Sequence, residues 1–169
     1  MRNLTIIERP ESVSVRALHS YWASKRGDRR APGRSDIDPI EIKSHLSTLF
    51  MLDVIDEGRD YHYRLIGTDI VEASGRDVTG ARFSDLYATQ PEALALVLRT
   101  FAPVVSEGRP VFAVGRMFWR PDRDFRHFEG GYFPLSTDGT SVDLMLCKMC
   151  FLDRRRPDER EATRTGGSP

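Results

Sequence analysis

Two cysteines, Cys147 and Cys150, have the spacing of a CxxC motif, which elsewhere forms a redox pair or half of a zinc site. They stand inside the apolar run 144–152, which is typical of a β-strand. Residues three apart on a strand point to opposite faces and lie about 10 Å apart along it, whereas a disulfide needs Cα atoms within about 7 Å. The sequence has no second cysteine pair that would complete a zinc site. We therefore interpret both cysteines as ordinary strand residues.

The four histidines, His19, His45, His62 and His127, are scattered and form no metal-binding motif. A histidine beside a carboxylate on a cavity floor would supply an acid–base pair for catalysis. His62, His127 and Glu129 are the candidates for such a pair, and they define the alternative hypothesis of a small α+β cavity enzyme. No spacing among them requires this chemistry, so the hypothesis depends on whether the fold brings a histidine and a carboxylate together.

Basic residues are concentrated in the stretch 25–34, beside Asp36 and Asp38. Arginine binds phosphate oxygens through two nitrogens at once, so this stretch is a candidate anion, nucleotide or nucleic-acid site. The structural alternative is that these charges pair with one another and fasten the N-terminal segment to the domain, with Asp38 capping a helix. Lys plus Arg and Asp plus Glu both number 25, so the net charge is zero. Proteins that bind nucleic acids or anionic membranes usually carry excess positive charge, which this chain lacks, so we expect neither kind of partner.

Arg64 is a charged residue between Tyr63 and Leu65, in a segment whose alternation predicts a strand. A strand arginine flanked by apolar residues must find a partner or face solvent. Its partner is either a structural acid, such as Asp36 or Asp69, or the carboxylate of a bound ligand. Arg64 is therefore the best polar candidate for contact with a ligand.

The elements that position these residues begin with an amphipathic helix. Val15, Leu18 and Trp22 recur at positions i, i+3 and i+7. Ser12 and Gly27 flank them and are typical residues for the start and the end of a helix. The pattern predicts a helix with one apolar stripe.

The rest of the chain is predicted to form strands and helices in separate runs. Two apolar segments around a polar turn at 56–60 predict an antiparallel hairpin, and glycines limit the helices that follow to short ones. This segregation predicts an α+β domain with an antiparallel sheet. The predicted helices span 38–46, 68–73, 82–87 and 91–107, and the predicted strands span 49–55, 61–66, 111–119, 125–135 and 141–152.

The length of 169 residues favours a single domain. We divide it into N-terminal flanking helices with a basic linker (1–47), a core (48–152) and a charged tail (153–169) that we expect to be disordered. The sequence contains no apolar stretch long enough for a signal peptide or a membrane helix. A cytoplasmic location is therefore expected.

The order of a strand pair, short helices, one long helix and three strands resembles the PAS domain. Five motifs in sequence carry the resemblance, and they make the chain similar to short stand-alone bacterial PAS proteins over about residues 12–150. The resemblance implies a PAS-like five-stranded antiparallel sheet with helices on one face and an N-terminal flanking helix. The motifs are Tyr21-Trp22 with Arg26, RSDIDP at 34–39, YRLIGT at 63–68, GRDVTG at 75–80, and FPLS at 133–136 with DG at 138–139.

The resemblance implies a sensory or adaptor module of bacterial signalling with no catalytic activity of its own. Its expected partners are a small apolar or weakly polar ligand, a signalling protein, or both. Haem-binding PAS domains use a histidine that usually lies on the long helix, and flavin adducts need a cysteine in the short-helix region. This chain has neither, so we expect no cofactor.

A ligand cavity in such a domain would lie between the sheet and the helices, with apolar walls and a few polar anchors. Gly130-Gly131 within a predicted strand marks a bulge or a close approach of another backbone or a ligand. Core packing is the alternative role for most of the aromatic candidates. The candidate ligand-binding residues are Tyr63, Arg64, Phe83, Tyr87, Phe101 and Tyr132.

The apolar stripe of the flanking helix, together with the apolar residues of 4–7 upstream, needs a surface that covers it. In PAS proteins, which this chain resembles, such a helix commonly pairs with its counterpart, so Val15, Leu18 and Trp22 are predicted to form a homodimer interface. The alternative is that the helix folds back and buries the stripe on its own sheet. Trp22 is buried in either arrangement.

Overall fold

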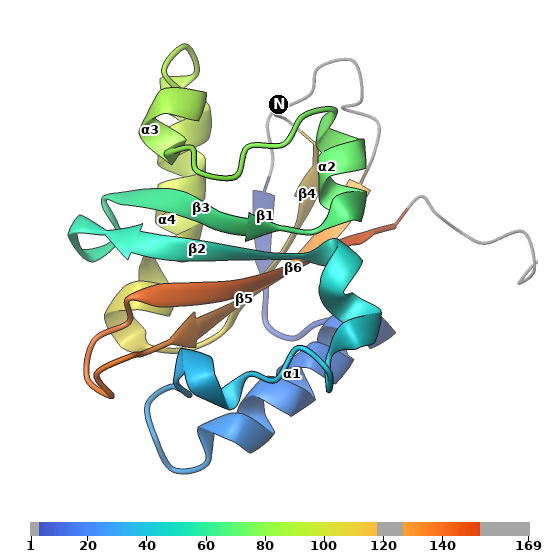
Figure 1. The fold of residues 1–169 in the computed structure, drawn as a ribbon. Helices are drawn as coiled ribbons and strands as arrows, with labels where there is room; N and C mark the ends of the chain where they lie inside the picture. The colour runs from blue at the N-terminus through green and yellow to red at the C-terminus, as the bar shows by residue number, and fades with distance from the viewer. Residues whose placement is uncertain (1–3, 118–126, 153–169) are drawn as a thin grey trace, which may run out of the picture.

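The computed structural model describes residues 4–117 and 127–152 (Figure 1). Its sheet has six strands in the order β1-β4-β5-β6-β2-β3, and all neighbouring strands are antiparallel. The α+β prediction is confirmed, with one strand more than the five expected because β1 pairs with β4. The strands are β1 (Leu4–Ile7), β2 (Leu49–Ile55), β3 (Asp60–Ile66), β4 (Val111–Arg116), β5 (His127–Leu135) and β6 (Leu144–Phe151).

Helices occupy the connections where the sequence supplies a start and a stop. Helix α1 begins after Ser12, whose side chain accepts a hydrogen bond from the Val15 N–H at 3.0 Å. Helix α4 begins at Pro91, a residue suited to the first helical turn, and stops at Gly108, where φ is +64°. The helices are α1 (Val13–Arg26), α2 (Thr68–Ser74), α3 (Phe83–Leu86) and α4 (Pro91–Glu107), with 3-10 turns η1 (Arg34–Asp36), η2 (Lys43–Thr48) and η3 (Asp56–Gly58).

Two residues of the basic stretch 25–34 pair with nearby acids. Arg29 lies 2.8 Å from Asp36, and Lys25 lies 2.6 Å from Glu41. These pairs fasten α1 to the segment that follows it, which is the structural role weighed for this stretch. The helix predicted over 38–46 is only partly present, since turns precede the 3-10 helix η2 there.

The two faces of the sheet carry separate cores, because successive strand residues point to opposite sides. On β6, Met145, Cys147 and Met149 belong to one core, whereas Leu144 and Leu146 belong to the other. The first core lies beneath α2, α3 and α4, on what we call the α4 face; the second lies beneath α1, on the α1 face (Figure 1). Helices therefore cover both faces, and the flanking helix forms the second layer.

Helix α1 packs on the sheet of its own chain. Val15, Leu18 and Trp22 are at most 2% exposed, and Trp22 Nε1 donates a hydrogen bond of 2.8 Å to the carbonyl of Pro134. The helix approaches closely because Gly131 has no side chain: a Cβ there would lie 2.7 Å from Val15 Cγ1. The predicted burial of Trp22 is confirmed. The predicted dimer interface is incompatible with this packing, since the stripe already faces β5 and β6.

Glu129 anchors the start of α1. Its carboxylate accepts hydrogen bonds from the backbone N–H groups of Glu11 and Ser12, at 3.1 and 2.8 Å. Burial raises the pKa of Glu129, and the two backbone N–H groups partly offset that rise. Glu129 is therefore a structural acid that holds α1 against β5.

The two cysteines lie on different faces of β6, as their spacing predicted. Cys147 belongs to the core of the α4 face, Cys150 packs against the core of the α1 face, and both are free thiols. The tail predicted to be disordered (153–169) and the parts of two predicted strands within 118–126 lie outside the described residues. No helix in the described ranges is long and apolar enough to cross a membrane.

Candidate ligand-binding site

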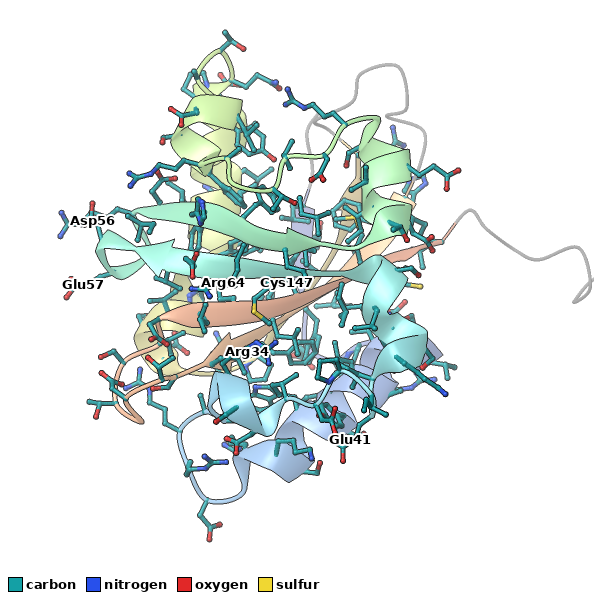
Figure 2. All side chains as sticks on the ribbon, in the orientation of Figure 1. Arg34, Glu41, Asp56, Glu57, Arg64 and Cys147 are labelled. Carbon is teal, nitrogen blue, oxygen red and sulfur yellow. The ribbon has the colours of Figure 1, made fainter. Side chains whose placement is uncertain are left out.

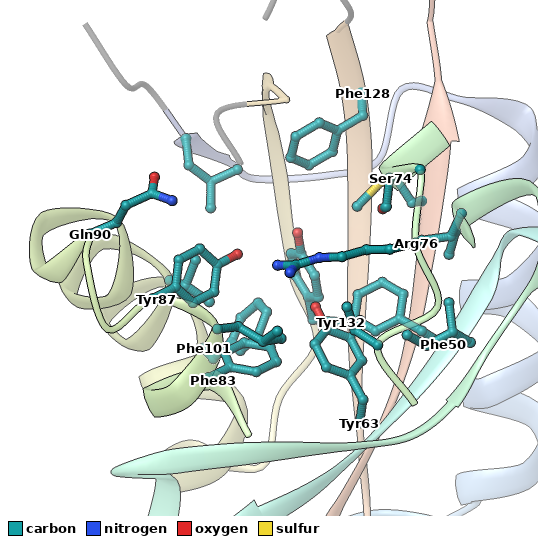
Figure 3. Close-up of a pocket in the computed structure, with 18 residues that line it drawn as sticks. Phe50, Tyr63, Ser74, Arg76, Phe83, Tyr87, Gln90, Phe101, Phe128 and Tyr132 are labelled. Carbon is teal, nitrogen blue, oxygen red and sulfur yellow. The ribbon is translucent and has the colours of Figure 1, made fainter. Parts of the chain in front are cut away.

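A cavity of about 240 Å³ lies between the α4 face of the sheet and the helices α2, α3 and α4 (Figure 3). It is larger than the roughly 150 Å³ cavity that holds a benzene molecule. It is smaller than most pockets for drug-sized ligands, which start near about 300 Å³. Its size therefore suits a molecule with about one ring. Its wall includes Phe50, Ile70, Phe83, Val97, Phe101 and Phe128 among apolar residues, and Tyr63, Arg76, Tyr87, Gln90 and Tyr132 among polar ones.

Aromatic side chains from separate elements form much of the wall. The rings of Phe101 on α4 and Tyr132 on β5 have centroids 4.6 Å apart, and those of Tyr63 on β3 and Phe83 on α3 are 4.9 Å apart. Tyr87, at the end of α3, adds an edge contact to Phe83. Such ring pairs are stable packing arrangements, so the wall holds its shape while leaving a space that an apolar group can enter.

Arg76 brings a positive charge to this aromatic cavity. It follows Gly75, which ends α2 in the left-handed conformation with φ of +74°, and the chain reverses there. The Arg76 side chain extends across the opening toward Tyr87 (Figure 3). The residue as a whole is exposed, and its charge acts on the buried phenols of Tyr63 and Tyr87. It makes no hydrogen bond or ion pair with any other described residue.

The tyrosines of the wall are neutral at physiological pH. Burial raises the pKa of Tyr63 well above its ordinary value and that of Tyr87 to about 12, while the charge of Arg76 lowers both in part. Burial also raises the pKa of Tyr132. Their phenols therefore remain hydrogen-bond donors in the site.

Gln90 contributes a second polar feature. Its Oε1 atom is buried and has no hydrogen-bond partner within the described part of the chain. A buried polar atom without a partner costs free energy, and Gln90 belongs to the cavity wall. A bound molecule that reaches this atom would therefore gain a hydrogen bond.

Five of the six residues predicted to bind a ligand line the cavity, and Arg64 does not. Arg64 donates from Nε and Nη2 to Oδ1 of Asp53, at 2.8 and 2.7 Å, on the sheet face opposite the cavity (Figure 2). The reason is strand alternation: Tyr63 points into the cavity, so its neighbour Arg64 points away. The structural acid is Asp53, neither Asp36 nor Asp69.

Arg76 and Gln90 are polar residues of the lining that sequence reasoning missed. Arg76 stood within the GRDVTG motif at 75–80, directly after a glycine that ends a short helix. That position was a partial signal, because a glycine that ends a helix marks a change in the direction of the chain. The new direction was not readable from the sequence.

The acid–base pair of the enzyme hypothesis exists, but outside the cavity. His62 Nδ1 lies 2.8 Å from Asp53 Oδ2, and Arg64 occupies the other carboxylate oxygen. Partial burial acts to raise the pKa of Asp53, but hydrogen bonds from Arg64 and His62 outweigh it and lower the pKa. Among the described residues, no histidine, aspartate or glutamate lines the cavity. His127 accepts from Arg116 at 3.3 Å and also lies outside it.

Comparison with known families settles the fold assignment. The model of a family described as "PAS domain" matches residues 10–149. The chain belongs to the PAS domain family. PAS domains are typically sensory and signalling modules, and the cavity between sheet and helices in this PAS domain lies where the resemblance implied one.

A solved structure supports the same fold. An RNA-binding Light-Oxygen-Voltage receptor matches with a TM-score of 0.52 and 14% sequence identity. The match covers 96% of this PAS domain and 43% of the receptor chain. At this identity the likeness shows the fold alone. No curated protein matches the sequence, and no group of three His, Cys, Asp or Glu side chains that could hold a metal lies within 4–117 or 127–152.

Proposed function

We propose that this PAS domain is a sensor that binds a small, weakly polar molecule in its cavity and signals through a protein partner. The observation that carries the proposal is the cavity of about 240 Å³ with aromatic walls from β3, β5, α3 and α4. A space of this kind is typical of small-molecule sites, which are concave and mostly apolar with a few polar anchors. Gln90 Oε1 and the phenols of Tyr63, Tyr87 and Tyr132 are the anchors.

A chain of contacts connects the cavity to the other face of the sheet. Helix α2 lines the cavity, and its Asp69 accepts a hydrogen bond of 3.1 Å from Ser47 in η2. The next residue, Thr48, accepts a hydrogen bond of 2.6 Å from Lys148 on β6. A ligand that shifts α2 would therefore act on η2 and on the packing around Lys148. We propose this route for passing occupancy to a partner.

The cavity does not support the rival enzyme hypothesis. Its described lining offers no carboxylate and no histidine for acid–base chemistry, and the Asp53–His62 pair is on the opposite face. We therefore infer a binding role without catalysis. A homodimer remains a prediction from the resemblance to PAS proteins, and it has to use a surface other than the stripe of α1.

Native mass spectrometry of the purified chain, followed by thermal-shift measurements with single-ring compounds, tests the proposal. Val97→Phe fills the cavity from α4, whereas Leu94→Phe adds the same ring on α4 outside the lining. We expect a compound to raise the melting temperature of the wild type and of Leu94→Phe, but not of Val97→Phe. Near-UV circular dichroism verifies that both variants are folded. A compound that stabilises all three chains equally, or no retained ligand and no stabilising compound, would contradict the proposal.

A further inference from the structure

The position of Arg76 supports an inference about the chemical class of the ligand. This inference rests on the proposed binding function. We propose that the cavity binds a small aromatic monocarboxylic acid, with its ring inside the cavity and its carboxylate paired with Arg76 at the mouth. The charge, the size and the wall chemistry of the site lead to this class separately.

The charge argument begins with the lack of an acidic partner for Arg76 among the residues that the structure describes. No acidic side chain belongs to the described lining of the cavity, and Arg76 forms no ion pair with any described residue. Tyr63 and Tyr87 lie near enough for the charge of Arg76 to lower their pKa values, so the guanidinium and the phenols share one region. A guanidinium offers two parallel N–H donors that match a carboxylate. Neutral phenols add donors for the same anion.

The size argument limits the apolar part. A cavity of about 240 Å³ exceeds the roughly 150 Å³ that holds benzene by the space of a short substituent. The rings of Phe83, Phe101 and Tyr132 provide faces and edges against which one aromatic ring can pack. A ring with a carboxylate one or two atoms away would place its charge near Arg76 and its ring among these side chains.

The wall chemistry disfavours other ligand classes. A phosphate carries more charge than a single arginine neutralises, and the other described residues of the wall offer only neutral groups. A dicarboxylate would bury its second charge among phenylalanines. A cationic ligand would meet the charge of Arg76 with no acid in the described lining to offset it. One carboxylate on an apolar ring matches both the charge of Arg76 and the apolar part of the wall.

The test compares phenylacetate with phenylacetamide, which has the same ring and a neutral amide in place of the carboxylate. Dissociation constants are measured by isothermal titration calorimetry or ligand-observed NMR on the full chain. The variants are Arg76→Gln and, as a matched control that removes one positive charge elsewhere, Arg64→Gln. Arg64 pairs with Asp53 outside the cavity, so both variants change the net charge equally.

We expect phenylacetate to bind the wild type about tenfold more tightly than phenylacetamide. Arg76→Gln should weaken the binding of phenylacetate by about tenfold and change that of phenylacetamide by no more than about threefold, so the preference for the acid should disappear. The expected effect is modest because Arg76 is an exposed residue. Arg64→Gln should leave both constants within about twofold.

Three outcomes would overturn the inference. The first is a wild type that binds the amide as tightly as the acid, in which case the cavity binds small molecules without recognising a carboxylate. The second is an Arg64→Gln variant that weakens phenylacetate as much as Arg76→Gln does, which would make the effect one of net charge. The third is the absence of binding of either probe at millimolar concentration; native mass spectrometry and Val97→Phe then judge the broader sensory proposal separately.

Discussion

The ring of Tyr132 lies over Gly130, two residues earlier on the same face of β5. A Cβ atom at Gly130 would lie 2.7 Å from Tyr132 Cζ and closer still to the hydroxyl oxygen, distances that packed atoms do not tolerate. Tyr132 forms part of the cavity wall, and its ring contacts Phe101. The missing side chain at Gly130 therefore decides where the Tyr132 phenol points within the site.

Gly130→Ala should displace Tyr132 and lower the free energy of unfolding by about 1–3 kcal/mol, the usual cost of overpacking a core. Tyr132→Phe removes the hydroxyl that is closest to the new methyl group. Combining the two changes should therefore cost less than the sum of the single changes, by at least about 0.5 kcal/mol. Urea unfolding of the four chains measures this coupling, and strictly additive energies would show that Tyr132 does not lie over Gly130.

Trp22→Ala should lower the free energy of unfolding by about 3–5 kcal/mol, because it empties a buried site between α1 and the sheet. Trp22→Phe keeps a ring but removes the donor to the Pro134 carbonyl, and should cost about 1–3 kcal/mol. Urea unfolding should rank wild type above Trp22→Phe and Trp22→Ala last. An unchanged unfolding midpoint for Trp22→Ala would mean that α1 does not pack on its own sheet.

Glu129→Ala should loosen the start of α1 and cost about 1–3 kcal/mol, since two backbone N–H groups lose their acceptor. Hydrogen exchange should accelerate at the amides of Glu11 and Ser12. Glu11→Ala is the control, because the backbone N–H of Glu11, and not its side chain, donates the hydrogen bond to Glu129. Equal exchange rates in the two variants would contradict the anchoring role.

Comparison with Lys148→Met should show that the buried amine of Lys148 makes the free energy of unfolding depend on pH. Lys148 is 2% exposed, and burial lowers its pKa to about 8 from an ordinary value of 10.5. Between these values the unfolded chain binds more protons than the folded chain, so raising the pH stabilises the folded wild type. The wild type should gain on the order of 1–3 kcal/mol relative to Lys148→Met between pH 7 and pH 10.

Urea unfolding at several pH values measures that difference, and groups that titrate alike in both chains cancel from it. Lys43→Met, at an exposed position, is the control and should show no such trend. A stability difference between wild type and Lys148→Met that stays constant from pH 7 to pH 10 would show that Lys148 titrates normally.

Local patterns in the sequence were sufficient for most elements of the fold. Period and capping residues predicted α1 and α4, and alternation around a polar turn predicted the hairpin of β2 and β3. These features depend on residues a few positions apart, so they can be predicted without knowledge of the tertiary contacts. The same alternation determined that Cys147 and Cys150 face opposite sides. The order of these elements, together with the five motifs, was enough to indicate a PAS domain.

The pairing of segments that lie far apart in the chain could not be predicted from such local patterns. The residues of β1 were expected to extend the apolar stripe of the first helix, but they pair with β4, more than 100 positions later. The apolar stripe of α1 does not indicate which surface covers it, because the hydrophobic effect is non-directional. Only the tertiary structure shows that Gly131 leaves room for Val15 and that the stripe is covered internally.

The candidate site shows the same difference between residues that local patterns predict and residues that only the tertiary structure places. Five of its aromatic residues could be predicted, since large rings in an α+β core gather between sheet and helices, and all five aromatic candidates do line the cavity. The polar anchor could not, because Tyr63 and Arg64 are neighbours on a strand and the sequence does not say which of the two faces inward. Arg64 pairs with Asp53, whereas Arg76, which follows the end of α2, lines the cavity. The residue types and their periodicity were properties of the sequence, whereas the direction of each charged side chain followed from contacts between segments far apart in the chain.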